Sequence, residues 1–251
     1  MPFKNETIWI IGASSGIGRE LSMQIAKSGA YLILSARREC ELKKLQKELH
    51  GNHKIYPMDV SDKEQVKNTC DEISKLENGI NRVIYMPAIY KPNFIIDMDL
   101  DFMSKMVDVN IKGAFYVTQG VLNIFKNQGY GQIALCASIA GYNGLPYGQP
   151  YSATKAAIIN FTESLHAEAP KYIDVKLISP GFVSTPMTAV NKFHMPMIMT
   201  PQKAANEIIN GLKNDAFEIH FPKKFTRLLK FLSLIPYWLK LKIIRKSLIK
   251  N

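Results

Sequence analysis

The sequence predicts an α/β fold of the doubly wound type, with a parallel seven-stranded sheet and helices on both faces. Short apolar runs alternate with longer segments of helical period along the chain. The 251 residues, 47% of them apolar, suffice for one sizeable core, and no linker or repeat marks a second domain. We therefore expect one domain over residues 1–222 and a separate C-terminal extension over residues 223–251.

The expected strands are short runs of apolar and β-branched residues. They are Thr7–Ile11, Tyr31–Ser35, Lys54–Met58, Arg82–Tyr85, Gln132–Ala137, Val175–Ser179 and Phe217–His220. Because a helical segment separates most neighbouring strands, right-handed crossovers would set them parallel in one sheet.

The expected helices show apolar residues at three- and four-residue spacing. They are Gly16–Ser28, Glu39–Leu49, Asp62–Leu76, Leu100–Asn127, Tyr151–Ala169 and Pro201–Asn214. Ser61, Asp99 and Thr200 stand where helices begin and are residue types that cap helix N-termini.

The charge is concentrated in the C-terminal extension. Of a formal net charge of +11, residues 1–222 carry only +2, whereas residues 223–251 hold nine Lys and Arg and no Asp or Glu. A body so close to neutrality has no electrostatic footprint for nucleic acid, which we therefore exclude as a partner.

The cysteines and the residues before the first strand indicate in which cellular compartment the protein is expected. Cys40, Cys70 and Cys136 are odd in number and lack metal-ligand spacing, so we expect reduced thiols and no metal site. No apolar signal segment precedes the first strand, so secretion is not expected. A cytoplasmic location fits both observations.

A glycine-rich turn follows the first expected strand directly. Gly12, Gly16 and Gly18 have the spacing Gly-x-x-x-Gly-x-Gly and lead into a helix. Glycine lets the backbone approach a pyrophosphate, and the free N–H groups and dipole of a helix N-terminus favour the anion. The candidate dinucleotide-binding residues of this turn are Gly12, Ser14, Ser15, Gly16, Ile17 and Gly18.

Arg37 and Arg38 follow the second strand, where NAD-binding proteins usually carry an acidic residue for the ribose hydroxyl. A carboxylate would repel a 2′-phosphate, whereas a guanidinium offers it a charged fork. The sequence thus favours NADP(H). The alternative is that both arginines simply begin a solvated helix.

Tyr151 and Lys155 begin an expected helix at i, i+4 spacing, which places the phenol and the ammonium on one face. A cation at about 4 Å and an effective dielectric of 20 contributes roughly 4 kcal/mol, or about three pKa units. We therefore expect Lys155 to lower the pKa of Tyr151 toward the range of a general acid or base. Alone, the pair is also common on exposed helices.

Together with Asn110 and Ser138, these motifs resemble the short-chain dehydrogenase/reductase family in its compact form, over residues 5 to about 220. The resemblance implies a Rossmann-like fold and hydride transfer between a nicotinamide and a carbonyl or alcohol substrate. It implies that Tyr151 is the acid/base, that Lys155 lowers its pKa and holds the nicotinamide ribose, that Ser138 binds the substrate oxygen, and that Asn110 supports a proton relay.

Further cofactor contacts come from the same resemblance. Asp59 and Val60 match the adenine contact of the family. The segment after the sixth strand matches the carboxamide site, with the Val183 backbone and the Thr185 hydroxyl as its contacts. The matching residues of that segment are Pro180, Gly181, Val183 and Thr185.

Two positions depart from the family pattern. Tyr85-Met86-Pro87-Ala88 stands where the family usually has Asn-Asn-Ala-Gly, and Ile11 replaces a threonine. Pro87 has no N–H to donate, so the usual hydrogen bonds beside the cofactor cannot all form. An NADP(H)-binding regulatory or membrane-interaction protein with little turnover therefore stands as the alternative to an active enzyme. An epimerase or dehydratase is disfavoured, because no room remains for a larger substrate domain.

Two loops should lie over the carboxyl edge of the sheet, where ligands bind: residues 141–150 and the Met-rich stretch 185–200. The Met-rich stretch is either an adaptable lid over an apolar substrate or ordinary helix packing. The resembled family forms homodimers or homotetramers through its long fourth helix and its catalytic helix, here 100–127 and 151–169.

The C-terminal extension reads as a basic amphipathic helix broken at Pro236. Its apolar positions before the break are Phe225, Leu228, Leu229, Leu232 and Ile235; those after it are Tyr237, Trp238, Leu241, Ile244 and Leu248. No uninterrupted apolar run is long enough to span a bilayer. The extension either lies on an anionic membrane surface, the inner face of a membrane, or packs on the protein's own core or a partner subunit.

Overall fold

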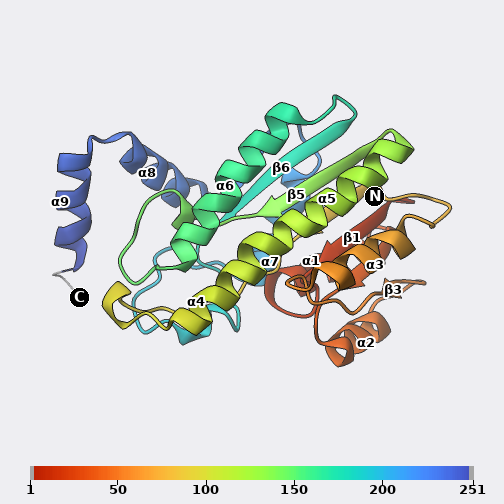
Figure 1. Ribbon diagram of the computed structural model, residues 1–251, viewed down its shortest axis with the longest axis horizontal. Helices are drawn as coiled ribbons and strands as arrows, with labels where there is room; N and C mark the ends of the chain where they lie inside the picture. The colour runs from red at the N-terminus through yellow and green to blue at the C-terminus, as the bar shows by residue number, and fades with distance from the viewer. Residues whose placement is uncertain (1–2, 249–251) are drawn as a thin grey trace.

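The computed structural model describes residues 3–248 and shows one parallel sheet of seven strands between two layers of helices (Figure 1). The strand order is β3-β2-β1-β4-β5-β6-β7, and every neighbouring pair is parallel. This is the doubly wound α/β fold that the sequence predicts, with the strand order reversing beside β1 and β4.

The strands are nearly continuous apolar runs because helices cover the sheet on both faces. Their bounds are β1 Thr7–Ile11, β2 Tyr31–Ser35, β3 Lys54–Ile55, β4 Arg82–Tyr85, β5 Gly131–Cys136, β6 Ile173–Pro180 and β7 Glu218–Phe221. All five residues of β1 are buried. Among them Trp9 is 0% exposed, and its indole N–H donates to Ser35 Oγ at 2.9 Å.

The third strand is shorter than its expected range, Lys54–Met58, and ends at Ile55. Pro57 lies within that range and has no N–H for the ladder. The N–H groups of Tyr56 and Met58 still donate to Leu34 O and Ala36 O, so the chain stays beside β2 without forming a regular strand.

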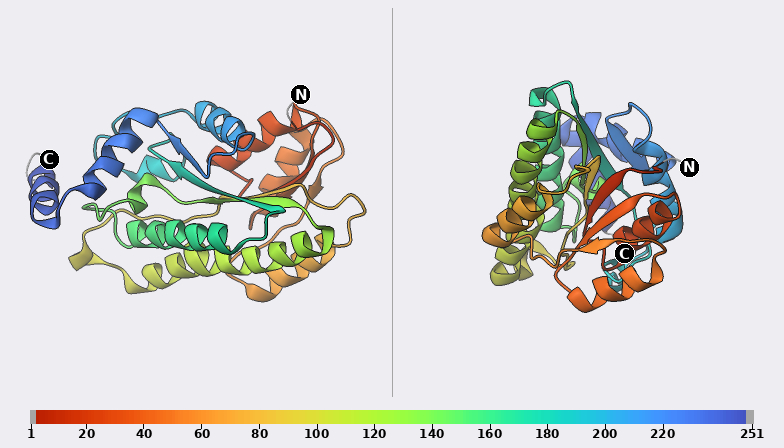
Figure 2. Two further views of the ribbon diagram at one scale, coloured as in Figure 1. Left: turned by 90° about the horizontal axis from the view of Figure 1, so that it is seen from above. Right: turned by 90° about the vertical axis from the view of Figure 1, so that its right-hand side faces the viewer.

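The helices divide between the two faces of the sheet (Figure 2). On one face lie α1 (Gly16–Ala26), α2 (Glu39–Glu48) and α7 (Pro201–Gly211), which share a core with Ile8 and Ile10. On the other lie α3 (Lys63–Ile73), α5 (Gly113–Gln128) and α6 (Tyr151–Glu168), which share a core with Trp9 and Ile11. Alternation along β1 thus supplies both cores.

The helix caps agree with the sequence at two of three positions. Asp99 caps α4 (Leu100–Val107) by accepting from Phe102 N, and Thr200 caps α7 by accepting from Lys203 N. Ser61 does not cap α3. The cap is Asp62, which accepts from the N–H groups of Glu64 and Gln65, while Ser61 donates to Asp59.

The single helix expected over Leu100–Asn127 is instead two α-helices, α4 and α5, joined by a π-helical turn at Asp108–Lys112. The wider turn inserts about one residue into the helical period and often marks a functional position. Asn110 lies in this turn and is fully buried.

The C-terminal extension forms two helices, α8 (Lys223–Leu234) and α9 (Tyr237–Leu248), with Pro236 between them as expected. The last basic residue, Lys250, lies outside the described residues. A search of residues 3–248 finds no helix with the length and apolar character needed to cross a bilayer.

Candidate active site

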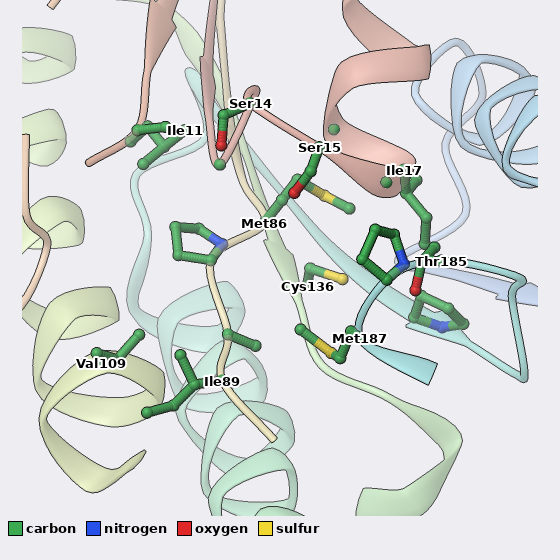
Figure 3. Close-up of a pocket in the computed structure, with 18 of the residues that line it drawn as sticks. Ile11, Ser14, Ser15, Ile17, Met86, Ile89, Val109, Cys136, Thr185 and Met187 are labelled. Atoms are coloured by element: carbon green, nitrogen blue, oxygen red, sulfur yellow. The ribbon is translucent and has the colours of Figure 1, made fainter. Parts of the chain in front are cut away.

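A cavity of about 280 Å³ opens at the carboxyl edge of the sheet. Figure 3 shows how its wall is assembled: Ser14 and Ser15 from the turn after β1 face Met86 from the segment after β4, and Thr185 and Met187 from the loop after β6 complete it. Segments far apart in sequence meet here because parallel strands end at the same edge.

Sixteen of the eighteen residues predicted for the site line this cavity. They are Gly12, Ser14, Ser15, Gly16, Ile17, Gly18, Arg37, Arg38, Val60, Ser138, Tyr151, Lys155, Pro180, Gly181, Val183 and Thr185. Asp59 and Asn110 lie behind the lining. Within residues 3–248, no group of three or more His, Cys, Asp or Glu side chains is placed to hold a metal ion.

The turn after β1 is built for close approach by a ligand. Gly12 and Gly16 have φ of +89° and +56°, which side chains rarely tolerate. A Cβ on Gly18 would lie 2.3 Å from Gly12 O, so helix α1 can pass this close to the turn only with glycine at that position. Ser15 precedes α1 without capping it by its side chain, and the first residues of the helix line the cavity.

Two guanidinium groups lie at the part of the cavity that follows β2. Arg38 donates to Ser14 Oγ at 3.2 Å, and the side chain of Arg37 is 60% exposed, with Nη1 4.0 Å from Asp59 Oδ2. Asp59 is otherwise engaged by the N–H and hydroxyl of Ser61. Asp59 thus lies beside Arg37 without being one of the lining residues, while Val60 lines the cavity.

Tyr151 and Lys155 lie on the first turns of α6. The Lys155 ammonium is buried, 5.7 Å from the centre of the Tyr151 ring, and donates to Cys136 O at 2.8 Å. The Tyr90 ring contacts Tyr151 edge-on at 4.9 Å between centroids. The predicted one-face arrangement of phenol and ammonium is therefore present.

The predicted lowering of the Tyr151 pKa is contradicted. Desolvation raises the pKa of Tyr151 above its ordinary value, and the Cys136 and Tyr90 groups add to this, against a lowering contribution from a Ser138 hydrogen bond. Burial also lowers the pKa of Lys155. The ammonium of Lys155 is directed to a backbone carbonyl, and desolvation dominates.

Ser138 ends β5 and begins a short 3₁₀ turn. Its Oγ accepts from Ala140 N at 3.1 Å and lies 3.4 Å from Pro180 O, and its hydrogen bond with Tyr151 opposes the raised pKa of that phenol. The Ser138 hydroxyl is thus held in place next to the Tyr151 hydroxyl.

Asn110 joins the π-turn to the neighbouring loops. Its Oδ1 accepts from Ile89 N at 2.8 Å, and its Nδ2 donates to Ile89 O and to Thr154 Oγ1, both at 3.1 Å. These bonds join the segment after β4 to α6 through the π-turn. A role for Asn110 in a proton relay remains a prediction.

The segment Tyr85–Ala88, which differs from the family pattern, is well packed in the structure. Tyr85 is buried, and its hydroxyl donates to Val109 O at 2.9 Å, at the start of the π-turn. Met86 N donates to Ile11 O at 2.9 Å. Met86, Pro87 and Ala88 line the cavity, as does Ile11, so both departures contact the space that a cofactor would fill.

Sequence reasoning missed Thr188. Its hydroxyl donates to Val183 O at 2.6 Å and accepts from Thr185 N at 3.0 Å, which shapes the segment expected to hold a carboxamide. It also missed Cys136 and Ala137 as lining residues, whereas Met187 belongs to the Met-rich stretch expected at this edge. The sequence could have indicated these residues only by their place along the chain, at or after the end of a strand, because such residues lie at the carboxyl edge of the sheet.

A second cavity, of about 180 Å³, adjoins the first. Ser138 and Tyr151 line both cavities, so these two residues lie where the cavities meet. The wall of the second cavity is mainly aromatic and aliphatic. Its apolar residues include Tyr90, Ile139, Leu145, Phe182, Phe193, Phe225 and Leu229.

The two loops expected over the sheet edge both contribute to this second cavity. Residues 145–148 belong to the first loop, and Met187 and Phe193 to the Met-rich stretch. Apart from a 3₁₀ turn at Thr188–Val190, the Met-rich stretch is irregular. Part of the stretch thus lines the cavity, whereas Met199 at its end packs against the core beside α1 and α7.

Comparison with known proteins places the chain among oxidoreductases. A family model described as short chain dehydrogenase matches residues 6–194. An uncharacterized oxidoreductase of Staphylococcus epidermidis is 30% identical over 210 residues, which cover 83% of this chain and 91% of that protein.

Solved structures of low sequence identity share the fold. An alcohol dehydrogenase from Thermococcus sibiricus, complexed with 5-hydroxy-NADP, has a TM-score of 0.78 at 23% identity, over 87% of this chain and 96% of that one. A short chain dehydrogenase/reductase from Burkholderia phymatum, in complex with NAD, has a TM-score of 0.82 at 19% identity, over 92% and 93%.

Proposed function

The chain belongs to the short chain dehydrogenase family, and on this basis we propose that it is an NADP(H)-dependent oxidoreductase acting on a carbonyl or secondary alcohol group. The observation that carries the proposal is the position of Tyr151 and Ser138, which line both the cavity beside the glycine-rich turn and the apolar cavity next to it. A proton donor at that junction is what carbonyl reduction requires.

The residues present fit a dinucleotide. The positive φ of Gly12 and Gly16 makes a cradle that a Cβ would fill, and the uncapped N-terminus of α1 offers N–H groups to a pyrophosphate. Arg37 and Arg38 would hold a 2′-phosphate, and among residues 3–248 the lining of the cavity includes no Asp or Glu, since Asp59 pairs with Arg37 from outside the lining. When bound, the reduced nicotinamide supplies the hydride.

The side chains of this protein would supply the proton and the electrostatic stabilisation. Because desolvation keeps Tyr151 protonated, its phenol can donate to the oxygen of a carbonyl as negative charge develops there. Ser138 would donate a second hydrogen bond to the same oxygen. The ammonium of Lys155 donates to Cys136 O and so joins α6 to the end of β5 beside the site.

The substrate class follows from the second cavity. Phe182, Phe193 and Phe225 belong to its wall together with aliphatic side chains, and such a surface favours an apolar group next to the reacting carbonyl. We therefore propose an apolar aldehyde or ketone, or the corresponding alcohol, as substrate.

The raised pKa of Tyr151 predicts how the rate depends on pH. Reduction uses the protonated phenol, which is fully present below the raised pKa, so kcat/KM for reduction should stay constant from about pH 6 to 9. Oxidation uses the phenolate and should rise about tenfold per pH unit over the same range. Initial rates in both directions test this, and a reduction rate that falls with an apparent pKa near 7 would contradict it.

The alternative of a cofactor-binding protein with little turnover rests on the Tyr85–Ala88 segment, where Pro87 brings no N–H to the cavity wall. Titration with NADPH and with NADH, followed by fluorescence, and then oxidation of the bound cofactor by a panel of apolar aldehydes and ketones, separates the two. We expect tighter NADPH binding with turnover. Selective binding without turnover would support the alternative, and binding of neither cofactor would refute both.

Compartment and assembly belong to the same proposal. Cys40, Cys70 and Cys136 are free thiols, which suits the reducing cytoplasm.

Phe115 on α5 is 41% exposed, and its ring lies 4.3 Å from that of Phe161 on α6, which gives these helices an apolar spot on their outer side. We propose that a homodimer or homotetramer forms through this pair of helices.

A further inference from the structure

Helix α8 has an inner side that is fixed to the body of the protein. Thr226 and Leu229 are buried, and Asn143 Nδ2 donates to Leu229 O at 2.9 Å. Lys230 forms an ion pair with Glu218 of β7. The Phe225 ring stacks on Phe182 at 6.1 Å between centroids. The position of α8 is thus set by several independent contacts.

The outer side of α8 is apolar yet exposed. Leu228, Phe231 and Leu234 are 63%, 63% and 81% exposed, and their three-residue spacing aligns them in one stripe along the helix. Lys224 and Arg227 are exposed beside this stripe. The inner side of α8 thus packs on the protein as one of the two expected alternatives has it, while binding to a membrane by the outer side stays a prediction.

Helix α9 continues this surface away from the sheet, at the end of the molecule (Figures 1 and 2). Tyr237, Trp238 and Leu241 are 74%, 66% and 58% exposed. The ammonium groups of Lys240 and Lys242 lie 4.4 Å and 5.6 Å from the ring centres of Tyr237 and Trp238. Cations and aromatic rings thus alternate over the same surface.

The charge of this surface has one sign. Residues 223–248 contain eight Lys and Arg and no Asp or Glu. Exposed apolar side chains of this extent mark an interaction site, and the cations select an anionic partner. A second copy of the chain would bring the same cations against themselves, because a symmetric contact uses the same patch on both subunits.

We propose that α8 and α9 together bind the surface of an anionic lipid bilayer. The apolar stripe of α8 and the aromatic rings of α9 would enter the boundary between headgroups and acyl chains, and the Lys and Arg side chains would contact lipid phosphates. The two helices lie on the surface, since neither has the length or apolar character to cross a bilayer.

This placement has a consequence for the second cavity. Phe225 and Leu229 on the inner side of α8 belong to its wall, so one helix would separate the cavity from the lipid. Ile95 and Ile96, 69% and 92% exposed, precede α4, and residues 94–100 lie at the same end of the long axis as α9 (Figure 1). If the proposed reaction takes place, an apolar substrate dissolved in the bilayer would thus be near the cavity. The proposal that the helices bind lipid does not itself depend on that reaction.

Co-sedimentation of the full chain with vesicles tests the proposal. We expect binding to vesicles of phosphatidylcholine with phosphatidylglycerol, weaker binding to phosphatidylcholine alone, and loss of binding as NaCl is added. The apolar variant Phe231→Ser/Leu234→Ser/Trp238→Ser and the charge variant Lys224→Glu/Arg227→Glu/Lys242→Glu should each bind at least about tenfold more weakly.

The control is Lys63→Glu/Lys67→Glu/Lys75→Glu, which makes the same change of charge at exposed lysines of α3 and the residues after it. It should bind like the unaltered chain. Because every substituted side chain is exposed, we expect all variants to fold, and circular dichroism melts check this. The proposal would be overturned if the unaltered chain failed to bind the anionic vesicles, or if both extension variants bound them as tightly as the unaltered chain does. A change of oligomeric state in the extension variants without lipid would also overturn it, because that change would assign the surface to a second copy.

Discussion

Replacing Tyr151 with phenylalanine should reduce kcat for carbonyl reduction about 100- to 10,000-fold, the usual contribution of a positioned general acid. The substitution removes only the hydroxyl that lines both cavities. Since the ring and its edge contact with Tyr90 remain, the Kd for NADPH should change little. Single-turnover reduction and a fluorescence titration measure the two quantities separately.

Tyr90→Phe is the matched control, because it removes a hydroxyl from the neighbouring ring in the same cavity. Burial raises the pKa of Tyr90 to about 12, and its hydroxyl donates to Asn191 Oδ1 at 2.9 Å. We expect a change in KM and at most a few-fold change in kcat. If Tyr90→Phe lost the activity and Tyr151→Phe kept it, the proton donor would be misassigned.

Replacing Arg37 with aspartate should reverse the preference between the two cofactors. A charge-assisted hydrogen bond contributes about 1.5–3 kcal/mol, so its loss weakens NADPH binding by about 10- to 150-fold, and repulsion from the new carboxylate adds to this. The same carboxylate can accept from a ribose hydroxyl, so the Kd for NADH should fall. Fluorescence titrations with both cofactors give the ratio of the two Kd values.

Arg37→Gln separates loss of the guanidinium from gain of the carboxylate, and should weaken NADPH binding without improving NADH binding. Lys213→Asp makes the same charge reversal at an exposed residue after α7, outside the cavity, and should leave both Kd values unchanged. Unaltered titrations for Arg37→Asp would mean that the guanidinium does not contact the cofactor.

The sheet could be predicted because its strands carry a strong local signal. β1 and β2 are almost wholly apolar and are bounded by turn residues, and such runs fit a sheet covered on both faces. The positions of the loops then followed from parallel topology alone. Sixteen site residues thus lined one cavity although none of the expected contacts could be seen in the sequence.

The π-turn could not be predicted. Its extra residue shifts the helical period by only a fraction of a turn, and the apolar pattern on either side tolerates the shift. The hydrogen bond from Tyr85 to Val109 O, which ties β4 to this turn, joins residues 24 positions apart and leaves no periodic signal.

The prediction that the pKa of Tyr151 is lowered was wrong for a related reason. Helical spacing placed Lys155 on the same face correctly, but desolvation depends on residues from other elements, among them Cys136 of β5 and Tyr90 of the segment after β4. Likewise, periodicity identified α8 as amphipathic without revealing that Leu229 would face inward and Leu228 outward.

The two tryptophans stand in opposite surroundings. Trp9 is fully enclosed in β1, whereas Trp238 on α9 is 66% exposed. Indole emission shifts to the red in water and is quenched by soluble acrylamide, so the two populations differ in both colour and access to quencher. The protein thus carries its own pair of optical reporters, one for the integrity of the sheet and one for the surroundings of α9, without any attached label.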